Sequence, residues 1–88
     1  MLEAKYTSQQ VAFIEAELTT ATTFLRRATT EVEFGRHSRV PALVKEARTA
    51  YAEALKLLDD LASRLPLERQ AFETRRREVA DHLERFRE

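Results

Sequence analysis

The sequence predicts an all-α protein folded as an up-down-up antiparallel three-helix bundle. Along two long stretches the apolar residues recur at alternating steps of three and four, the spacing of one face of an α-helix. The 88 residues include one glycine and two prolines, far fewer turn residues than a protein of many short strands needs. A chain of this length is expected to form a single domain, 1–88, with one core layer between its helices.

The first helix is expected over residues 3–34. Its apolar seam consists of Val11, Ile14, Leu18, Ala21, Leu25, Ala28 and Val32. Several threonines in this stretch lower the intrinsic helix propensity by a few tenths of a kcal/mol each. The seam continues through them, so we expect one uninterrupted helix that ends at Gly35, a residue suited to a left-handed cap.

A second apolar stripe lies on the first helix, about a quarter turn from the seam. It consists of Leu2, Tyr6, Phe13 and Phe24, which fall within ~40° of one another at 100° per residue. We expect the third helix to cover this stripe. The alternative is an exposed aromatic surface used for oligomer formation.

The second helix is expected over residues 39–62. Its seam consists of Val40, Val44, Ala47, Tyr51, Ala54, Leu58, Leu61 and Leu65. Leu43, Ala50 and Leu57 widen this apolar arc, so the helix is expected to contact more than one neighbour.

The third helix is expected over residues 64–87. The sequence Ser38-Arg39-Val40-Pro41 recurs as Ser63-Arg64-Leu65-Pro66, and each copy is typical of a helix start with serine as the N-cap and proline in the first turn. The alternative fold is a long helical hairpin that is only kinked at Pro66 and dimerises into a four-helix bundle. At 1.5 Å per residue the hairpin would be roughly 70 Å long, against about 50 Å for the bundle.

Two arginines, Arg69 and Arg76, fall in the third-helix seam when the two helix starts are superposed. Arg69 is placed to pair with Glu73 at i,i+4, or with Glu15 or Glu17 on the first helix. Arg76 is expected to lay its stem across the apolar residues beside it and expose its charged head. The candidate partner surface therefore consists of Leu2, Tyr6, Arg69, Phe72, Arg76 and Val79. Residues 2–10 are expected to extend beyond the rest of the bundle.

The charges of the chain cancel, with 15 basic and 15 acidic residues, so nucleic acid is an unlikely partner on electrostatic grounds. A smaller anion-binding cluster is possible in the first turn, at Arg36, His37 and Arg39. It supports an alternative function as a weak anion or nucleic-acid binder that uses arginine clusters.

The sequence predicts no catalytic residues, no cofactor and no metal site. Cysteine is absent, and two histidines leave few ways to build a metal centre or an acid–base pair. Glu78 and His82 are spaced i,i+4 on the third helix, but two ligands do not form a site. The start MLEAKYTSQQ lacks a signal-peptide pattern and no apolar run approaches a membrane span, so a cytoplasmic protein is expected.

The segment from Ala47 to Leu55 alternates small and large residues, with Ala47, Tyr51 and Ala54 along one helix. It resembles the helical hairpins of tetratricopeptide domains and the three-helix MIT domain. The resemblance implies antiparallel helices in tight contact through their alanines, with a peptide or helix as ligand. The sequence thus leads us to expect a non-enzymatic helical protein-interaction or self-association module whose partner is another protein or a second copy in a homodimer.

Overall fold

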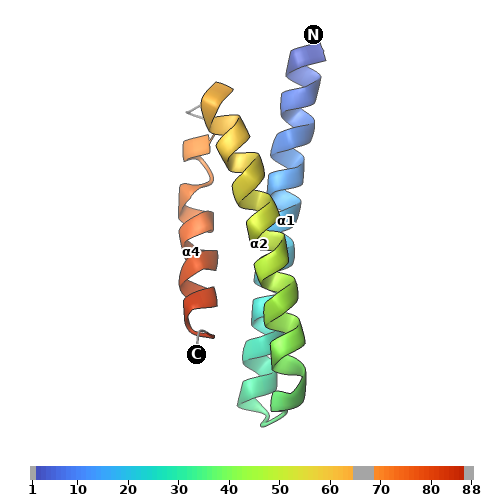
Figure 1. Ribbon diagram of the computed structural model, residues 1–88, viewed down its shortest axis with the longest axis vertical. Coiled ribbons are helices and arrows are strands. Elements are labelled where there is room, and N and C mark those ends of the chain that lie inside the picture. The colour runs from blue at the N-terminus through green and yellow to red at the C-terminus, as the bar shows by residue number, and fades with distance from the viewer. Residues whose placement is uncertain (1, 65–68, 87–88) are drawn as a thin grey trace.

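The computed structural model describes the backbone of residues 2–64 and 69–86, and the side chains of 8–63 and 69–86. Helix α1 (Leu2–Glu33) is followed by the short 3₁₀ helix η1 (His37–Arg39), by α2 (Val40–Arg64) and by α4 (Glu73–Glu84). The chain runs down α1, up α2 and down α4, and these three helices pack side by side (Figure 1). The expected up-down-up three-helix bundle is confirmed. Its longest dimension of 51 Å matches the bundle and not the long hairpin.

The turn after α1 is a Schellman motif centred on Gly35. The Gly35 N–H donates to the carbonyl of Val32 at 3.0 Å, and the Arg36 N–H donates to the carbonyl of Glu31 at 2.8 Å. Gly35 has φ of 71°, the left-handed conformation in which a side chain is disfavoured. The Arg36 side chain also pairs with Glu31, 2.7 Å from Nε to the carboxylate, so an ion pair replaces the apolar contact that often accompanies this motif. The only glycine of the chain thus ends α1, as the sequence predicts.

The two predicted serine caps differ from expectation. Ser38 lies within η1, and Pro41 follows in the first turn of α2. Ser63 lies inside α2, where its hydroxyl donates to the carbonyl of Asp60 at 2.8 Å, so it does not cap a third helix. Pro66 lies outside the described residues.

The third helix is shorter than the predicted 64–87. Arg69 and Gln70 are helical, Ala71 and Phe72 form a turn, and α4 begins at Glu73. Beside this interruption Phe72 is buried, at 6% exposure, and Arg69 is half-buried.

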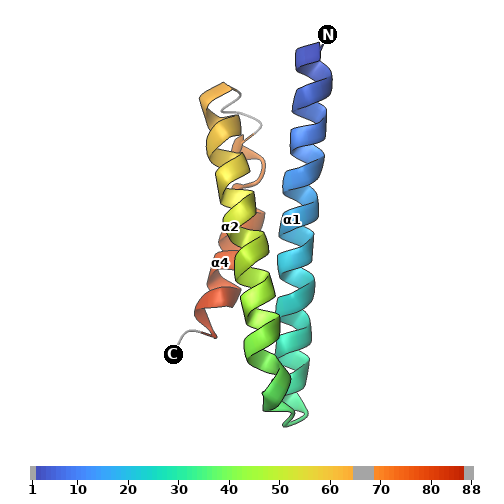
Figure 2. The ribbon, with the colours of Figure 1, turned by 45° about the vertical axis from the view of Figure 1, so that its right-hand side comes forward.

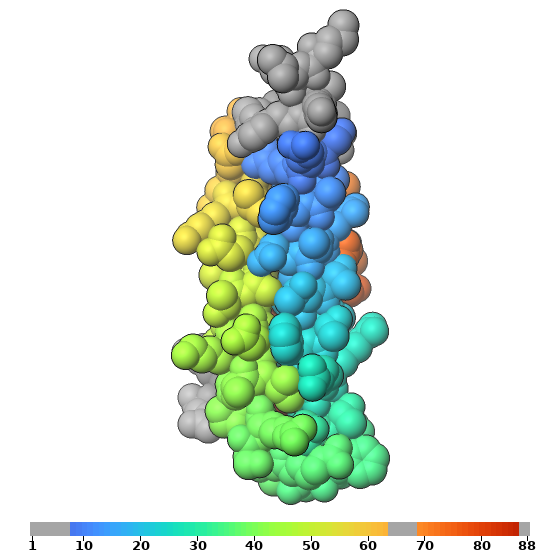
Figure 3. Space-filling view, turned by 90° about the vertical axis from the view of Figure 1, so that its right-hand side faces the viewer, coloured from blue at the N-terminus to red at the C-terminus, as the bar shows by residue number. Residues whose placement is uncertain are grey.

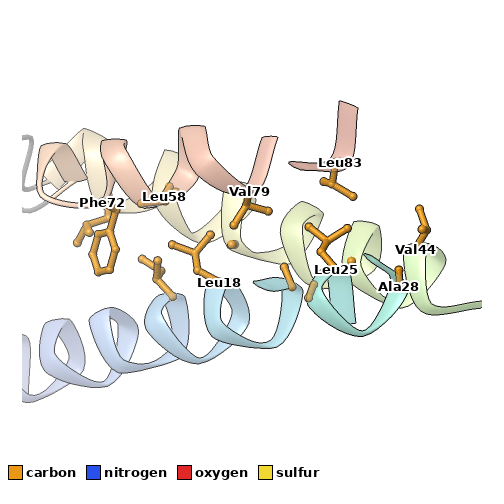
Figure 4. Close-up of a cluster of buried hydrophobic side chains, with 14 residues drawn as sticks. Leu18, Leu25, Ala28, Val44, Leu58, Phe72, Val79 and Leu83 are labelled. Carbon is orange, nitrogen blue, oxygen red and sulfur yellow. The ribbon is translucent and has the colours of Figure 1, made fainter. Parts of the chain in front are cut away.

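The core lies between the three helices, with Val79 and Leu83 of α4 facing Leu18 and Leu25 of α1 (Figure 4). Small residues let α1 and α2 approach each other closely. The buried alanines of these two helices are Ala21, Ala28, Ala47, Ala50 and Ala54. The predicted tight contact through the alanines of the second helix is therefore present.

The start of α1 extends beyond the end of α2 (Figures 1 and 2), but by less than the predicted residues 2–10, because Gln10 is bonded to Leu57 and Asp60 and therefore lies beside α2. Leu2 and Tyr6 lie in the first two turns of α1. None of the helices in the described residues contains the long apolar stretch that crossing a bilayer requires.

Candidate interaction surface

Helix α4 covers one side of the α1–α2 pair and leaves the other side open. Its side chains hydrogen-bond with Thr19 and Thr29 on α1 and with Tyr51 on α2. At 100° per residue, Phe13 lies about 120° from Thr19 and about 160° from Thr29, while Leu57 lies about 120° from Tyr51. Figure 3 shows this open side, with α1 and α2 in front and α4 visible only at the edge. The third helix therefore does not cover the aromatic stripe at Phe13.

Two adjoining pockets on the open side form what we call the α1–α2 groove. It is lined by Gln9, Gln10, Phe13, Glu17, Glu53 and Leu57. The pockets have volumes of about 260 and 180 Å³ and share Phe13 and Leu57 as their apolar lining. Phe13 is 63% exposed, unusual for a phenylalanine in a small helical protein. The alternative expectation of an exposed aromatic surface therefore describes this residue better.

Gln10 holds one end of the groove together. Its side chain is buried, and Nε2 donates to the Asp60 carboxylate at 2.7 Å and to the Leu57 carbonyl at 3.4 Å. A buried amide needs such partners, so these bonds stabilise the register of α1 against the end of α2. Sequence reasoning missed Gln10, although its spacing of four residues before Ile14 places it on the seam face.

The groove has an acidic rim. Glu17 and Glu53 line it, and the Asp60 carboxylate lies beside it through its bond to Gln10. One ammonium is close, because Lys56 Nζ lies 3.9 Å from the carboxylate of Glu53. The Lys56 side chain is 76% exposed, and surface pairs of this kind contribute at most about 1 kcal/mol. The charged residues that line the groove, Glu17 and Glu53, are both acidic, so carboxylates flank its apolar centre.

Among the residues predicted for a partner surface, those whose side chains the structure describes do not form one. Phe72 and Val79, at 6% and 3% exposure, belong to the core between α4 and the other helices. The side chains of Leu2 and Tyr6 lie outside the described residues. The superposition of the two helix starts placed Phe72 and Val79 correctly in the seam, but the seam is covered within the subunit and offers no groove.

Arg69 and Arg76 meet at Glu73. Arg69 Nη1 lies 3.0 Å from the Glu73 carboxylate, and Arg76 Nε donates to the same carboxylate at 3.1 Å. The hydrogen bond from Arg76, and then the charges of Arg76, Arg69 and Arg77, lower the pKa of Glu73 to about 2, although desolvation acts in the opposite direction. The expected i,i+4 pair of Arg69 with Glu73 is present, and within the described residues Arg69 forms no ion pair with Glu15 or Glu17.

Arg76 differs from its predicted environment. Its guanidinium donates to Glu73 and, at 3.3 Å, to the hydroxyl of Tyr51 on α2, and its side chain is only 25% exposed. These hydrogen bonds, the one to Glu73 first, raise the pKa of Arg76 above its usual value. The predicted exposed head is wrong, because Glu73, one turn earlier on the same helix, supplies a carboxylate that holds the guanidinium.

His82 joins α4 to α1. Its Nε2 lies 2.9 Å from the Thr29 hydroxyl, which itself donates to the carbonyl of Leu25 at 3.0 Å. Because the Thr29 proton is used there, His82 Nε2 carries the proton in this contact and Thr29 accepts it. Burial, and then the nearby charges of Arg85 and Arg26, lower the pKa of His82. His82 is therefore a neutral structural contact between helices.

The predicted anion cluster lies at the turn between α1 and α2. Arg36, His37 and Arg39 line an open, polar pocket of about 610 Å³. Arg36 is already paired with Glu31, which lines the same pocket, and its guanidinium carbon lies 5.2 Å from the centre of the Phe34 ring. The carboxylate reduces the positive potential that an anion would need.

Within the part of the chain that the structure describes, no three or more histidine, aspartate or glutamate side chains lie together as a metal site would require. Glu78 and His82 lie on α4, where two such side chains remain too few for a metal site. Comparisons with protein-family models, with curated proteins and with solved structures find no match to this chain.

Proposed function

We propose that this protein is a non-enzymatic helical interaction module whose α1–α2 groove binds a partner, either another protein or a second copy. The observation that carries the proposal is the exposure of Phe13 beside Leu57 on the side that α4 leaves open. A large aromatic side chain in water is unfavourable by roughly 1.5 to 3 kcal/mol relative to its buried state. Binding at the groove would recover part of this free energy.

Helical packing supports a helix as the bound element. The groove lies between two antiparallel helices, the place where a further helix of a bundle packs through apolar residues spaced three and four apart. The tetratricopeptide-like and MIT-like pattern from Ala47 to Ala54 points to the same kind of ligand. We therefore favour a helix over an extended peptide, because no strand edge is present in the described residues to pair with one.

The alternative function, a weak anion or nucleic-acid binder, receives less support. Arg69, Arg76 and Arg77 share the Glu73 carboxylate, and Arg36 pairs with Glu31. An arginine whose charge is offset in the subunit contributes less to phosphate binding. Binding to a polyanion that is strong at low salt and collapses at moderate salt would favour this alternative over the interaction module.

The experiment that tests the interaction module compares three full-length baits: the wild-type chain, Phe13→Ser and Phe34→Ser. Phe34 is the matched control, since it is 69% exposed but lies at the turn outside the groove. Each bait is exposed to extract from the organism that encodes the chain, and sedimentation velocity measures self-association. We expect the wild type and Phe34→Ser to capture the same proteins from the extract, or to form a dimer, and Phe13→Ser to do neither. Identical results for all three baits would refute a role of the groove.

A further inference from the structure

We infer that the α1–α2 groove accepts an amphipathic helix with lysine or arginine beside its apolar residues. This inference rests on the proposed function and names the chemistry of the partner. It follows from the charges around the groove, from its apolar centre and from its length.

The apolar centre of the groove determines which residues a partner would contact first. Phe13 and Leu57 belong to both pockets, so a ligand that enters either pocket contacts the same two side chains. Gln9 and Gln10 close one end of the groove, and Glu17 with Glu53 closes the other. From residue 9 to residue 17, α1 rises about 12 Å, which is roughly two helical turns. A partner helix would therefore present apolar residues at i and i+3 or i+4.

The rim decides between a basic partner and a second copy of this chain. Glu17 and Glu53 line the groove beside its apolar centre, and no basic residue is among the described residues that line it; the ammonium of Lys56 lies 3.9 Å from the Glu53 carboxylate. In a two-fold dimer centred on the groove, each subunit would present the same patch, so these carboxylates would face their own counterparts. Like charges across an interface are unfavourable, whereas lysine or arginine on a partner would meet them with opposite charge. Charge complementarity thus favours a basic helix.

The α4 helix of a second copy is also a poor occupant. Its apolar side chains Phe72, Val79 and Leu83 are buried in its own bundle. The residues that it exposes to solvent are Thr74, Arg77, Glu78, Asp81 and Glu84. This set has no apolar residue to place between Phe13 and Leu57 and carries both signs of charge.

The test uses the full-length protein and synthetic peptides of about 16 residues, labelled for fluorescence anisotropy. The first peptide has leucines at i, i+3, i+4 and i+7 with lysines elsewhere, and its twin has glutamate in place of every lysine. A third peptide keeps the lysines and replaces the leucines with serine, which measures binding by charge alone. We expect the Leu/Lys peptide to bind at least ~10-fold more tightly than either of the others, a difference of about 1.4 kcal/mol.

Protein variants locate the bound peptide. Glu17→Gln/Glu53→Gln and Phe13→Ser are each expected to weaken binding of the Leu/Lys peptide by at least ~10-fold. The matched controls are Glu78→Gln/Asp81→Asn, which removes two charges from the exposed side of α4, and Phe34→Ser. These controls are expected to change the affinity by less than about 2-fold, a difference of roughly 0.4 kcal/mol. Circular dichroism checks that each variant remains helical. Where a variant does not, the bound peptide is located instead from the changes in the backbone amide chemical shifts of Phe13 and Leu57 when the peptide is added to the wild-type protein.

The inference is overturned if the glutamate twin binds as tightly as the lysine peptide, or if the groove variants bind as the controls do. It is also overturned if the wild-type chain dimerises and Phe13→Ser abolishes the dimer, because the occupant is then a second copy. In either case the proposed function survives when binding of natural partners or self-association still requires Phe13. Both proposals fail together only when no binding of any kind depends on Phe13.

Discussion

At the residue scale, the cluster around Glu73 determines what Arg76 does. Replacing Arg76 with leucine removes its hydrogen bonds to Glu73 and to the Tyr51 hydroxyl. We expect Arg76→Leu to lower the free energy of unfolding by about 1 to 3 kcal/mol, since hydrogen bonds to charged groups contribute in this range. Denaturant melts measure the change.

Arg77→Leu is the control, because the Arg77 side chain is 69% exposed and lies 3.7 Å from the Glu73 carboxylate. This substitution should change the free energy of unfolding by at most ~0.5 kcal/mol. A neutral or stabilising Arg76→Leu would contradict the paired role.

Glu73 should make the stability of the protein depend on acid pH. Its pKa is about 2 in the folded state, against an ordinary value of 4.5, so the unfolded chain binds a proton at this site first as the pH falls. The contribution of Glu73 is therefore present above about pH 4.5 and is lost as the pH falls towards 2. We expect the unfolding free energy of Glu73→Gln to fall less steeply than that of the wild type over this interval. Urea melts at several pH values test the difference.

Glu78→Gln is the control for this pH dependence, because Glu78 lies on the same helix outside the arginine cluster. It should keep the wild-type slope. If Glu73→Gln also keeps that slope, the arginines do not hold the Glu73 carboxylate as the geometry indicates.

At the element scale, the end of α1 depends on the left-handed conformation of Gly35. Alanine at this position would be strained by about 1 to 2 kcal/mol, and no atom beyond the two neighbouring residues lies within 4 Å of the added methyl group to alter the result. We expect Gly35→Ala to lower the unfolding free energy by this amount and Gly35→Asn to lower it less, because asparagine tolerates this conformation better. Chemical denaturation of the three proteins gives the order. An alanine variant as stable as the wild type would exclude the strain.

The helices themselves could be predicted from the sequence because their apolar spacing is regular. The seam residues Ile14, Leu18 and Leu25 of α1 are buried, as are Val44, Leu58 and Leu61 of α2. Val32 is an exception at 41% exposure, because it lies in the last turn of α1, beside the connection to α2. The interruption at Ala71 and Phe72 was not predicted, since heptad spacing continues through it and carries no signal for a local turn.

The side on which α4 packs could not be predicted from apolar spacing alone. The aromatic stripe containing Phe13 is more apolar than the threonine side of α1, yet α4 packs on the latter. The hydroxyls of Thr22 and Thr29 donate to backbone carbonyls of α1 one turn earlier, which satisfies them within their own helix. Thr29 then still accepts from His82, so polar side chains of both helices are compatible with this interface. A pattern that scores only apolar residues misses this complementarity, and with it the position of the groove.

At the scale of the whole molecule, α4 is needed to complete the core of the α1–α2 hairpin. Phe72, Val79 and Leu83 are buried against that hairpin. At roughly 1.5 to 3 kcal/mol each, their burial contributes about 5 to 9 kcal/mol, comparable to the total stability of a small domain. We therefore expect a chain truncated after residue 64 not to persist as a folded monomer. It should be largely unfolded at low concentration, or dimerise by pairing the sides of α1 and α2 that α4 covers in the intact chain.

Circular dichroism melts and sedimentation velocity over a ~100-fold range of concentration distinguish these two forms, because a dimer becomes more stable by mass action as concentration rises. The Phe13→Ser substitution in the truncated chain serves as control. Phe13 lies on the side opposite to the one that α4 covers, so this substitution should leave a dimer formed through the bare α4 side intact. Loss of the dimer with Phe13→Ser would show that the groove pairs with the groove of a second copy, despite the like charges of Glu17 and Glu53. A truncated monomer that melts within a few degrees of the full chain would show that α1 and α2 fold without α4, and that the uncovered groove belongs to a self-sufficient hairpin.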